Sequence, residues 1–274
     1  MRQPPDGRSL LRAPTFLFLI LFLLAGCRAA ENDADRAPLR VLASDFAPFY
    51  YRDGDGQAAG LEHLILQSFA RAEDREVEVV WVDDFGTIFE ALKRGEGDLI
   101  ASTLTITEER ARRLDFTAPY FPVLALLVER KSWPSLGLAS LPGRKVVTIK
   151  GTTYERILNG IEGIEIVYVR TEEEMYQMVA RGDADALVTD SANFLWIGRR
   201  FPELHITAPL SERSFYGFAV RKNDPLRDEL DRHLEEIKRS GVYWGFVEEV
   251  FGEIAGEYLE DLKAGDEEFL SPER

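Results

Sequence analysis

Two segments of the chain carry side chains that could together hold a zwitterion. The first, residues 103–110, has threonines at positions 103, 105 and 107 and ends in Arg110. An arginine beside a threonine hydroxyl and exposed backbone amides can hold a carboxylate through charge-assisted hydrogen bonds. The second segment, residues 184–190, ends in Asp190, whose carboxylate can accept an ammonium group. The two segments therefore predict a binding site for an α-amino acid.

A glycine turn supplies further candidate donors. The sequence KGTTYE at 150–155 follows an apolar stretch at 145–149. Backbone amides in such a turn attract anions. We therefore expect Gly151 and Thr153 to help bind the same carboxylate.

Arg110 also fits an ordinary role. With Thr107 as N-cap and two glutamates in the first turn, it could be a helix-surface arginine paired with Glu109 or Asp115. What favours a binding site is that further polar residues fall in register with it, namely Thr105, Thr153 and Asp190.

The elements that would position these residues alternate between strand and helix. Strand patterns cover 39–43, 76–82, 145–149 and 164–170, and the run at 76–82 is rich in valine. Helix patterns cover 60–72 and 87–94, where glycines 95 and 97 end the second. Such alternation predicts an α/β protein whose sheets carry crossover helices.

A weak internal repeat divides the chain. Residues 94–103 (RGEGDLIAST) parallel residues 181–190 (RGDADALVTD), and each copy follows a strand and a helix. Glycine followed by aspartate is also common turn chemistry. In open α/β sheets, however, ligands bind beyond the carboxyl ends of strands, where Thr103 and Asp190 fall. The repeat therefore predicts two lobes that face one cleft.

Composition excludes several classes of protein. The 274 residues are 45% hydrophobic and carry a formal charge of −15, which repels nucleic acid. One cysteine and three scattered histidines give no disulfide and no metal-ligand spacing. The chain has no nucleotide-binding glycine motif and no nucleophile elbow. We expect no cofactor, no metal, no nucleic-acid partner and no enzymatic activity.

The N-terminus has the pattern of an export signal. Three arginines precede the apolar run 16–24, which is followed by Ala-Gly-Cys27, so residues 1–26 are a predicted signal peptide. The order LAGC resembles the lipobox of bacterial lipoproteins, which implies a lipid on Cys27. A retained plain anchor is the alternative. Residues 27–37 are a predicted flexible tether. The signal peptide and the lipid together predict a protein on the periplasmic or extracytoplasmic face of a membrane.

The chain resembles the extracellular solute-binding proteins of family 3, which are the polar amino-acid receptors of ABC importers. The resemblance runs from Leu39 to Gly252 and rests on TITEER at 105–110, LDFTAPY at 114–120, KGTTYE at 150–155, ADALVTD at 184–190 and GVYW at 241–244. It implies an α/β, two-lobed periplasmic-binding-protein-like fold (type II) with a two-stranded hinge. The predicted parts are lobe 1 at 38–127 and 216–252, lobe 2 at 128–215, and an acidic tail at 253–274.

The resemblance also implies roles for individual residues. Arg110, Thr105, Thr153 and Gly151 would bind the ligand's α-carboxylate, and Asp190 with the Thr103 carbonyl would bind its ammonium. Phe46 and Phe85 would sandwich its side chain, although each also fits a core position. Asp45 lies one residue closer to the Ala-Pro-Phe turn than in many members of the family, which displaces it from the expected position.

The implied partners are an amino acid or related solute, ABC permease subunits, and the membrane through Cys27, with the receptor itself a monomer. Two alternatives stay open. Segments 84–92 and 186–204 also resemble the receptor-like module of membrane-bound lytic transglycosylase F, and the 22 residues after Gly252 are too few for its catalytic domain. A sensor of this kind is one alternative, and a cyclohexadienyl-dehydratase-like enzyme on the same scaffold is the other.

Overall fold

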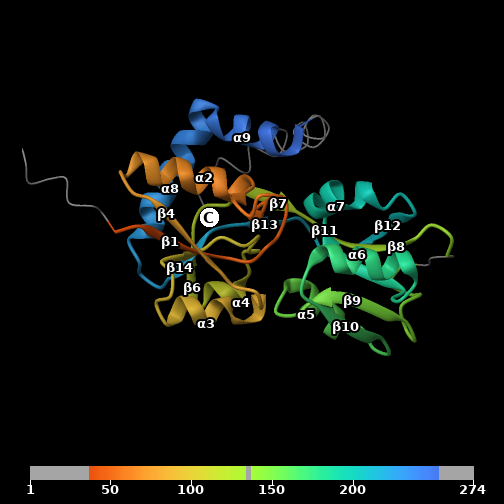
Figure 1. Ribbon diagram of the computed structural model, residues 1–274. Helices are drawn as coiled ribbons and strands as arrows, with labels where there is room; N and C mark the ends of the chain where they lie inside the picture. The colour runs from red at the N-terminus through yellow and green to blue at the C-terminus, as the bar shows by residue number, and fades with distance from the viewer. Residues whose placement is uncertain (1–36, 134–136, 253–274) are drawn as a thin grey trace, which may run out of the picture. The chain divides into compact units, whose positions relative to one another are not determined.

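The computed structural model describes residues 37–133 and 137–252 (Figure 1). The predicted signal peptide, Cys27, nearly all of the tether and the acidic tail lie outside the described residues. The described residues from 38 onward belong to one compact unit. None of the helices in the described part of the chain combines the length and the apolar character that a membrane crossing needs.

The first sheet has five strands. Their order is β4 (Val77–Trp81), β1 (Leu39–Ala43), β5 (Leu99–Ile100), β14 (Ala219–Arg221) and β6 (Leu114–Phe116). β1 runs parallel to β4 and β5, whereas β14 is antiparallel to both of its neighbours. A short antiparallel ribbon, β2 (Tyr51–Arg52) with β3 (Ala58–Ala59), follows β1.

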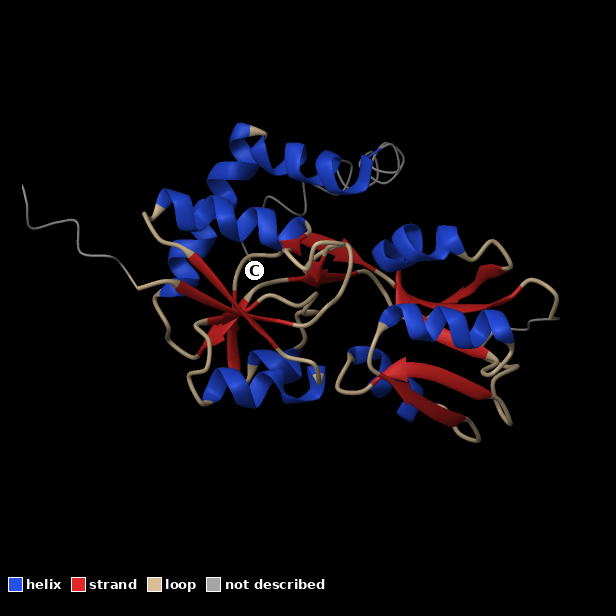
Figure 2. Ribbon diagram, in the orientation of Figure 1, coloured by secondary structure: helices blue, strands red, loops and turns tan. Residues whose placement is uncertain are grey.

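Helices cover both faces of this sheet (Figures 1 and 2). One face carries α2 (Leu61–Ala72), α8 (Leu226–Ser240) and α9 (Val242–Phe251). The other carries η1 (Phe85–Thr87), α3 (Ile88–Lys93) and α4 (Glu108–Ala111). Alternate residues of β1 explain the two layers, because Val41 packs in one hydrophobic cluster and Leu42 in the other.

The second sheet repeats the first. Its order is β10 (Glu165–Val169), β9 (Lys145–Ile149), β11 (Ala186–Asp190), β8 (Ala125–Arg130) and β12 (Leu204–Pro209). Its helices are α5 (Thr153–Asn159), α6 (Glu172–Arg181), α7 (Ser191–Ile197) and η2 (Gly198–Arg200). β9 is parallel to β10 and β11, and β8 is antiparallel to β11 and β12.

A two-stranded antiparallel ladder joins the two sheets. The chain leaves the first sheet through β7 (Phe121–Val123) and returns through β13 (Ser214–Tyr216), which pairs with β7. The second sheet already begins at Ala125, shortly before the boundary at 127 that the sequence suggests. The predicted α/β, two-lobed type II architecture is confirmed.

The internal repeat has a structural cause. Asp98 exchanges hydrogen bonds with the backbone of Arg40, at 2.9 Å to the Arg40 amide and 2.7 Å to its carbonyl. Asp185 makes the same pair with Lys145, at 2.7 and 2.8 Å. The aspartate of the repeat therefore holds the start of β5 beside the start of β1 in the first sheet, and the start of β11 beside the start of β9 in the second.

Helix α2 buries Leu61, Ile65 and Phe69 of the apolar face that its sequence pattern predicts, together with one acidic residue. Leu64 is partly exposed, whereas Glu62 is fully buried. The Glu62 carboxylate accepts hydrogen bonds from the Tyr120 hydroxyl and, at 2.9 Å, from the Thr103 amide. A buried polar group with partners replaces an expected apolar contact, and it supports a segment of the predicted site.

Candidate functional site

Arg110 is held by neutral acceptors. Thr107 caps α4, and its side chain accepts a 3.2 Å hydrogen bond from the Arg110 amide, as predicted. The guanidinium donates to the carbonyls of Thr105 at 3.0 Å and Gly151 at 3.3 Å. Among the described residues, no carboxylate oxygen lies within the 4.0 Å ion-pair distance of this guanidinium. Its positive charge is thus not neutralised by a direct partner.

A second cation lies near Arg110. Burial, and then the nearby charge of Arg156, lower the pKa of Arg110 to about 10. The guanidinium still keeps its proton at neutral pH. An anion placed between the two arginines would relieve their repulsion.

Six of the predicted site residues line one small pocket, which we call the aromatic pocket. Its lining comprises Phe46, Phe85, Thr103, Thr105, Arg110, Ile149, Thr152, Thr153, Tyr154 and Glu172. The rings of Phe46 and Phe85 are almost fully buried, and their centroids lie 5.4 Å apart. The pocket has a volume of about 20 Å³, close to the space of one water molecule. Binding of an amino acid therefore requires the surrounding side chains or lobes to move.

Asp190 is linked to the aromatic pocket by its hydrogen bond with Tyr154. It ends β11, is 2% exposed, and accepts hydrogen bonds from the hydroxyls of Tyr154 at 2.8 Å and Tyr216 at 2.7 Å. Its other oxygen accepts from the Asn193 amide at 2.8 Å and so caps α7. Burial raises the pKa of Asp190, although these hydrogen bonds oppose the shift. Tyr154 lines the pocket, whereas Asp190 lies behind it.

The glycine turn differs from the expectation in one respect. The Gly151 amide donates to the Glu155 carboxylate at 2.7 Å, so it is already partnered. Gly151 has a φ of +82°, and a Cβ there would lie 2.8 Å from the Cα of Gly86. A larger residue would therefore push the two segments apart. Its carbonyl, not its amide, faces Arg110.

Thr103 and Thr153 are both at the pocket. Thr103 has an unusual φ of +48°, and its amide donates to Glu62. Thr153 is the first residue of α5, and Thr152 caps this helix by accepting from the Glu155 amide at 3.4 Å. Thr153 therefore lies at a helix N-terminus, where backbone amides lack intrahelical partners, whereas Thr103 lies in the loop after β5.

Asp45 lies outside the aromatic pocket. Its side chain is exposed and accepts hydrogen bonds from the Arg52 amide at 3.1 Å and the Arg52 guanidinium at 3.4 Å. The ion pair with Arg52 holds the Asp45 carboxylate away from the aromatic pocket. The structure therefore does not place Asp45 among the pocket residues, where the sequence predicts it.

The sequence reasoning missed Glu172 and Asn193. Thr171 caps α6 and three glutamates form its first turn, as predicted, but Glu172 points into the aromatic pocket and is buried. Burial, and then the nearby Asp190 charge, raise the pKa of Glu172 well above its usual range. Asn193 donates to the Glu172 carboxylate and, at 3.1 Å, to the Ala47 carbonyl. Asn193 thus ties Glu172 to the first lobe.

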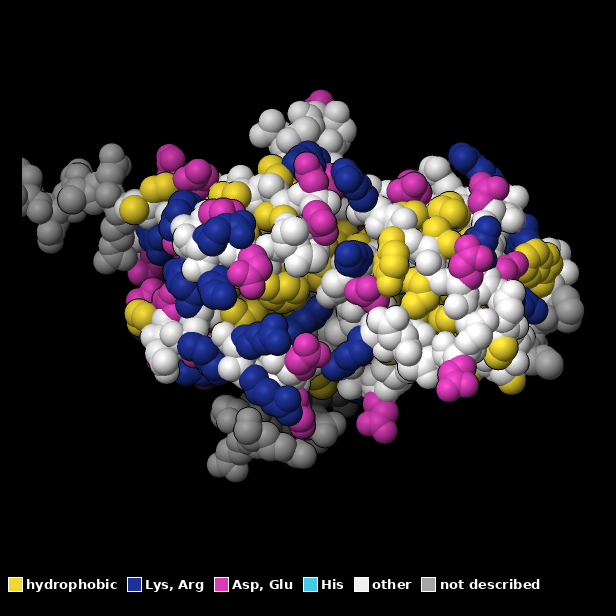
Figure 3. Space-filling view, turned by 90° about the horizontal axis from the view of Figure 1, so that it is seen from below, with side chains coloured by type: hydrophobic (Ala, Val, Ile, Leu, Met, Phe, Trp, Pro, Cys, Tyr) yellow, Lys and Arg dark blue, Asp and Glu magenta, His cyan; other side chains and the backbone are white. Residues whose placement is uncertain are grey.

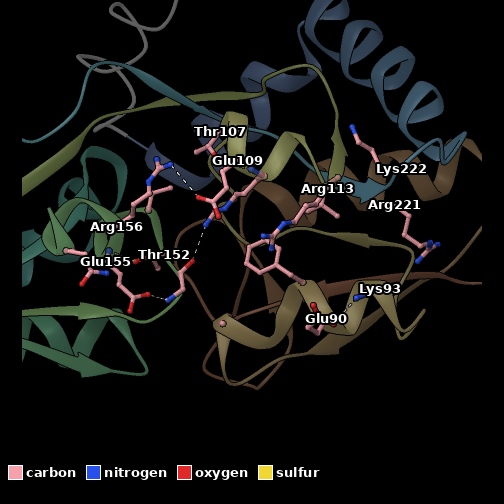
Figure 4. Close-up of a pocket in the computed structure, with 17 residues that line it drawn as sticks. Glu90, Lys93, Thr107, Glu109, Arg113, Thr152, Glu155, Arg156, Arg221 and Lys222 are labelled. Carbon is pink, nitrogen blue, oxygen red and sulfur yellow. Dashed lines mark hydrogen bonds and ion pairs between the residues drawn. The ribbon is translucent and has the colours of Figure 1, made fainter.

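A larger cavity opens on the other side of Arg110, and we call it the basic cavity (Figure 4). Its volume is about 840 Å³. Its charged lining residues are Lys93, Arg110, Arg113, Arg156, Arg221 and Lys222 with Glu90, Glu109 and Glu155. The two cavities share Arg110, Thr152 and Thr153.

Comparison with known proteins places the chain in a class. Residues 39–253 match the family described as bacterial extracellular solute-binding proteins, family 3, and the chain belongs to this family. The L-arginine-binding protein of Pseudomonas aeruginosa is 30% identical over 222 residues, which cover 75% of this chain and 85% of that protein. A solved structure described as an ancestral arginine-binding protein bound to arginine superposes with a TM-score of 0.74 at 32% identity, covering 79% of this chain and 99% of that one.

A second kind of relative is an enzyme. The membrane-bound lytic murein transglycosylase F of Desulfosudis oleivorans is 34% identical over 192 residues. The match covers 67% of this chain but only 42% of the transglycosylase. The resemblance to both kinds of protein that the motifs suggest is therefore confirmed.

Proposed function

We propose that this protein captures an amino acid in the aromatic pocket and delivers it to an ABC importer. The observation that carries the proposal is that a guanidinium and a carboxyl group line the same small pocket, with a second carboxylate directly behind it. Arg110, without a carboxylate partner among the described residues, and Glu172 both line the pocket, and Asp190 lies behind it, hydrogen-bonded to Tyr154. A zwitterion fits this arrangement, because its carboxylate and ammonium each meet a buried opposite charge.

Glu172 favours a ligand with a second positive charge. A single ammonium needs only one carboxylate, whereas two buried carboxylates close together repel each other and are stabilised by added cationic charge. The names of the arginine-binding relatives agree with this chemistry. We therefore expect a cationic amino acid such as arginine to bind more tightly than a neutral one.

The mechanism is capture followed by closure. Ligand contacts to Arg110 in lobe 1 and to Asp190 in lobe 2 form together only when the lobes approach, so the ligand stabilises the closed form. The ladder of β7 and β13 is the only pair of strands in the described chain that joins the two sheets, and it would serve as the hinge. A lipid on Cys27 would keep the receptor at the membrane beside its permease.

A thermal-shift screen tests this proposal. The purified protein is heated with each of the twenty amino acids, with cell-wall peptides and with prephenate. A ligand at one hundred times its Kd adds about 2.7 kcal/mol to the free energy of unfolding. Stabilisation by arginine or another amino acid that is recovered unchanged is the expected result. Consumption of prephenate would contradict it and support the dehydratase alternative.

A sensing role is the second candidate. The similarity to transglycosylase F, in which the matched region is less than half of the protein, supports a module that reports a ligand to another domain or partner. A response to cell-wall peptides and to none of the free amino acids would favour this candidate over transport.

A further inference from the structure

The basic cavity contrasts with the rest of the chain. The protein carries a formal charge of −15, yet the lining of this cavity contains six cationic and three acidic side chains. Figure 3 shows Lys and Arg side chains gathered on the face seen from below. Like charges on a surface repel each other unless an anion lies between them. Such a concentration in an acidic protein therefore indicates a binding surface.

The cations come from separate elements and face one space. Arg156 projects from α5 on one side, and Arg113, Arg221 and Lys222 lie on the other (Figure 4). Arg156 is close enough to Arg110 to lower its pKa. Arg110 is half-buried and is the one charged residue that both cavities share.

The acidic residues of the lining neutralise only part of the positive charge of the basic cavity. Glu109 lies 3.8 Å from Arg156, and Glu90 lies 3.7 Å from Lys93, which are long ion pairs between exposed side chains. Glu155 accepts from the Gly151 amide. Lys222 is paired with Asp115 at 2.7 Å and Arg221 with Asp224 at 3.1 Å, whereas Arg113 has no ion pair within 4.0 Å among the described residues.

The volume sets the size of the ligand. About 840 Å³ is far more than a single phosphate or acetate needs and falls within the range of sites for small organic molecules. Several separated cations favour a ligand with several separated oxyanion groups, since each group can then meet its own partner.

We propose that the basic cavity binds a small solute with two or more oxyanion groups, such as a polycarboxylate, at a site beside the aromatic pocket. The site overlaps the aromatic pocket at Arg110, Thr152 and Thr153, whereas Arg113, Arg156 and Lys222 line the basic cavity alone.

Calorimetry with citrate tests this proposal on the full-length protein at low ionic strength, with inorganic phosphate and acetate as comparison probes. We expect citrate to bind with a stoichiometry of one and more tightly than acetate. Binding of phosphate as tight as that of citrate would overturn the assignment to a ligand with several separated groups. Absence of citrate binding at millimolar concentration would overturn the site itself.

A charge-matched pair of variants separates a built site from general attraction. Arg113→Gln combined with Arg156→Gln should weaken citrate binding about tenfold or more, because each removes a cation from the lining. Arg112→Gln with Arg232→Gln removes the same charge from exposed side chains outside the cavity and should change citrate affinity less than twofold. An equal loss in both double variants would overturn the proposal. Amino-acid binding measured on the same samples reports the aromatic pocket separately.

Discussion

The hydroxyl of Tyr216 donates a 2.7 Å hydrogen bond to Asp190 and so joins strand β13 of the connecting ladder to the end of β11. The same carboxylate oxygen also accepts from Tyr154, which lines the aromatic pocket. A buried carboxylate is costly unless donors surround it, and these two hydroxyls supply that stabilisation. The group that should bind a ligand's ammonium is thus held in place by tyrosines from the ladder and from α5.

Tyr216→Phe should lower the free energy of unfolding by about 1–3 kcal/mol at pH 7, because it removes a hydrogen bond to a buried charge without changing the ring. Urea unfolding measures the change. Tyr168→Phe is the control, since Tyr168 is 45% exposed and its hydroxyl bonds to Glu155 at the surface, so loss of this hydroxyl should change stability little. Equal losses in the two variants would show that the hydrogen bond to Asp190 contributes nothing specific.

Glu172→Gln should reduce the preference for cationic ligands. The substitution keeps the shape and removes the negative charge, so arginine should bind about 10- to 100-fold more weakly while glutamine keeps its affinity within a few-fold. Calorimetry with both ligands gives the ratio. Glu174→Gln is the matched control, because Glu174 lies on the same helical turn and is exposed. A similar weakening of both ligands by Glu172→Gln would contradict a role in selectivity.

The raised pKa of Glu172 adds a pH dependence to this binding. Burial and the nearby Asp190 charge favour the protonated form of Glu172 more than water does, whereas a nearby cation favours the carboxylate, so binding of arginine should be coupled to proton release. Arginine affinity should consequently rise with pH through the pKa of Glu172. Comparing the binding heat in buffers of different ionisation enthalpy counts the proton, and Glu172→Gln should abolish its release.

Glu62 should make the protein more stable in mild acid. Burial raises its pKa from 4.5 to about 7, so the native state holds a proton that the unfolded chain releases at lower pH. The stability from this group is fully present below about pH 4.5 and is lost as the pH rises to about 7, a difference on the order of 3 kcal/mol. Unfolding measured across this range should show a slope that Glu62→Gln flattens. An unchanged slope would mean that other groups cause it.

The sequence predicted the backbone elements better than the polar contacts. Strands 39–43 and 145–149 match β1 and β9 to the residue, because a buried strand must be a short, continuous apolar run. The N-caps at Thr107 and Thr171 also hold, since capping depends only on local residue types. The repeat likewise predicted two similar sheets.

The missed contacts depend on residues far apart in the sequence. Glu172 looks like its two neighbours in a run of glutamates, and only its bond with Asn193, 21 positions later, selects it for the pocket. Asp45 turns outward because Arg52 pairs with it, and Tyr154 reaches Asp190 across 36 positions. Local patterns carry no information on such pairs, so the position of an element is predictable and the direction of a side chain is not.

Cys27→Ser should release the protein from the membrane fraction. The lipobox-like order LAGC predicts that lipid is attached to this cysteine, and a serine offers no thiol for that attachment. Fractionation followed by mass measurement of the mature N-terminus tests the prediction. Retention of the variant in the membrane with an uncleaved signal would instead support a plain N-terminal anchor.

Arg110→Ala should weaken amino-acid binding by about 3–5 kcal/mol, because the ligand's carboxylate would be left without a partner in a desolvated pocket. Arg110 also bonds to the carbonyls of Thr105 and Gly151, so the same variant could loosen the site indirectly. Arg110→Lys separates the two effects, since it keeps the charge but not the fork geometry. Arg110→Lys should lose less binding than Arg110→Ala. Arg112→Ala should bind as the wild type does, because the Arg112 side chain is 76% exposed at the end of the same helix. Calorimetry that gave the Arg110→Ala variant wild-type affinity would remove Arg110 from the site.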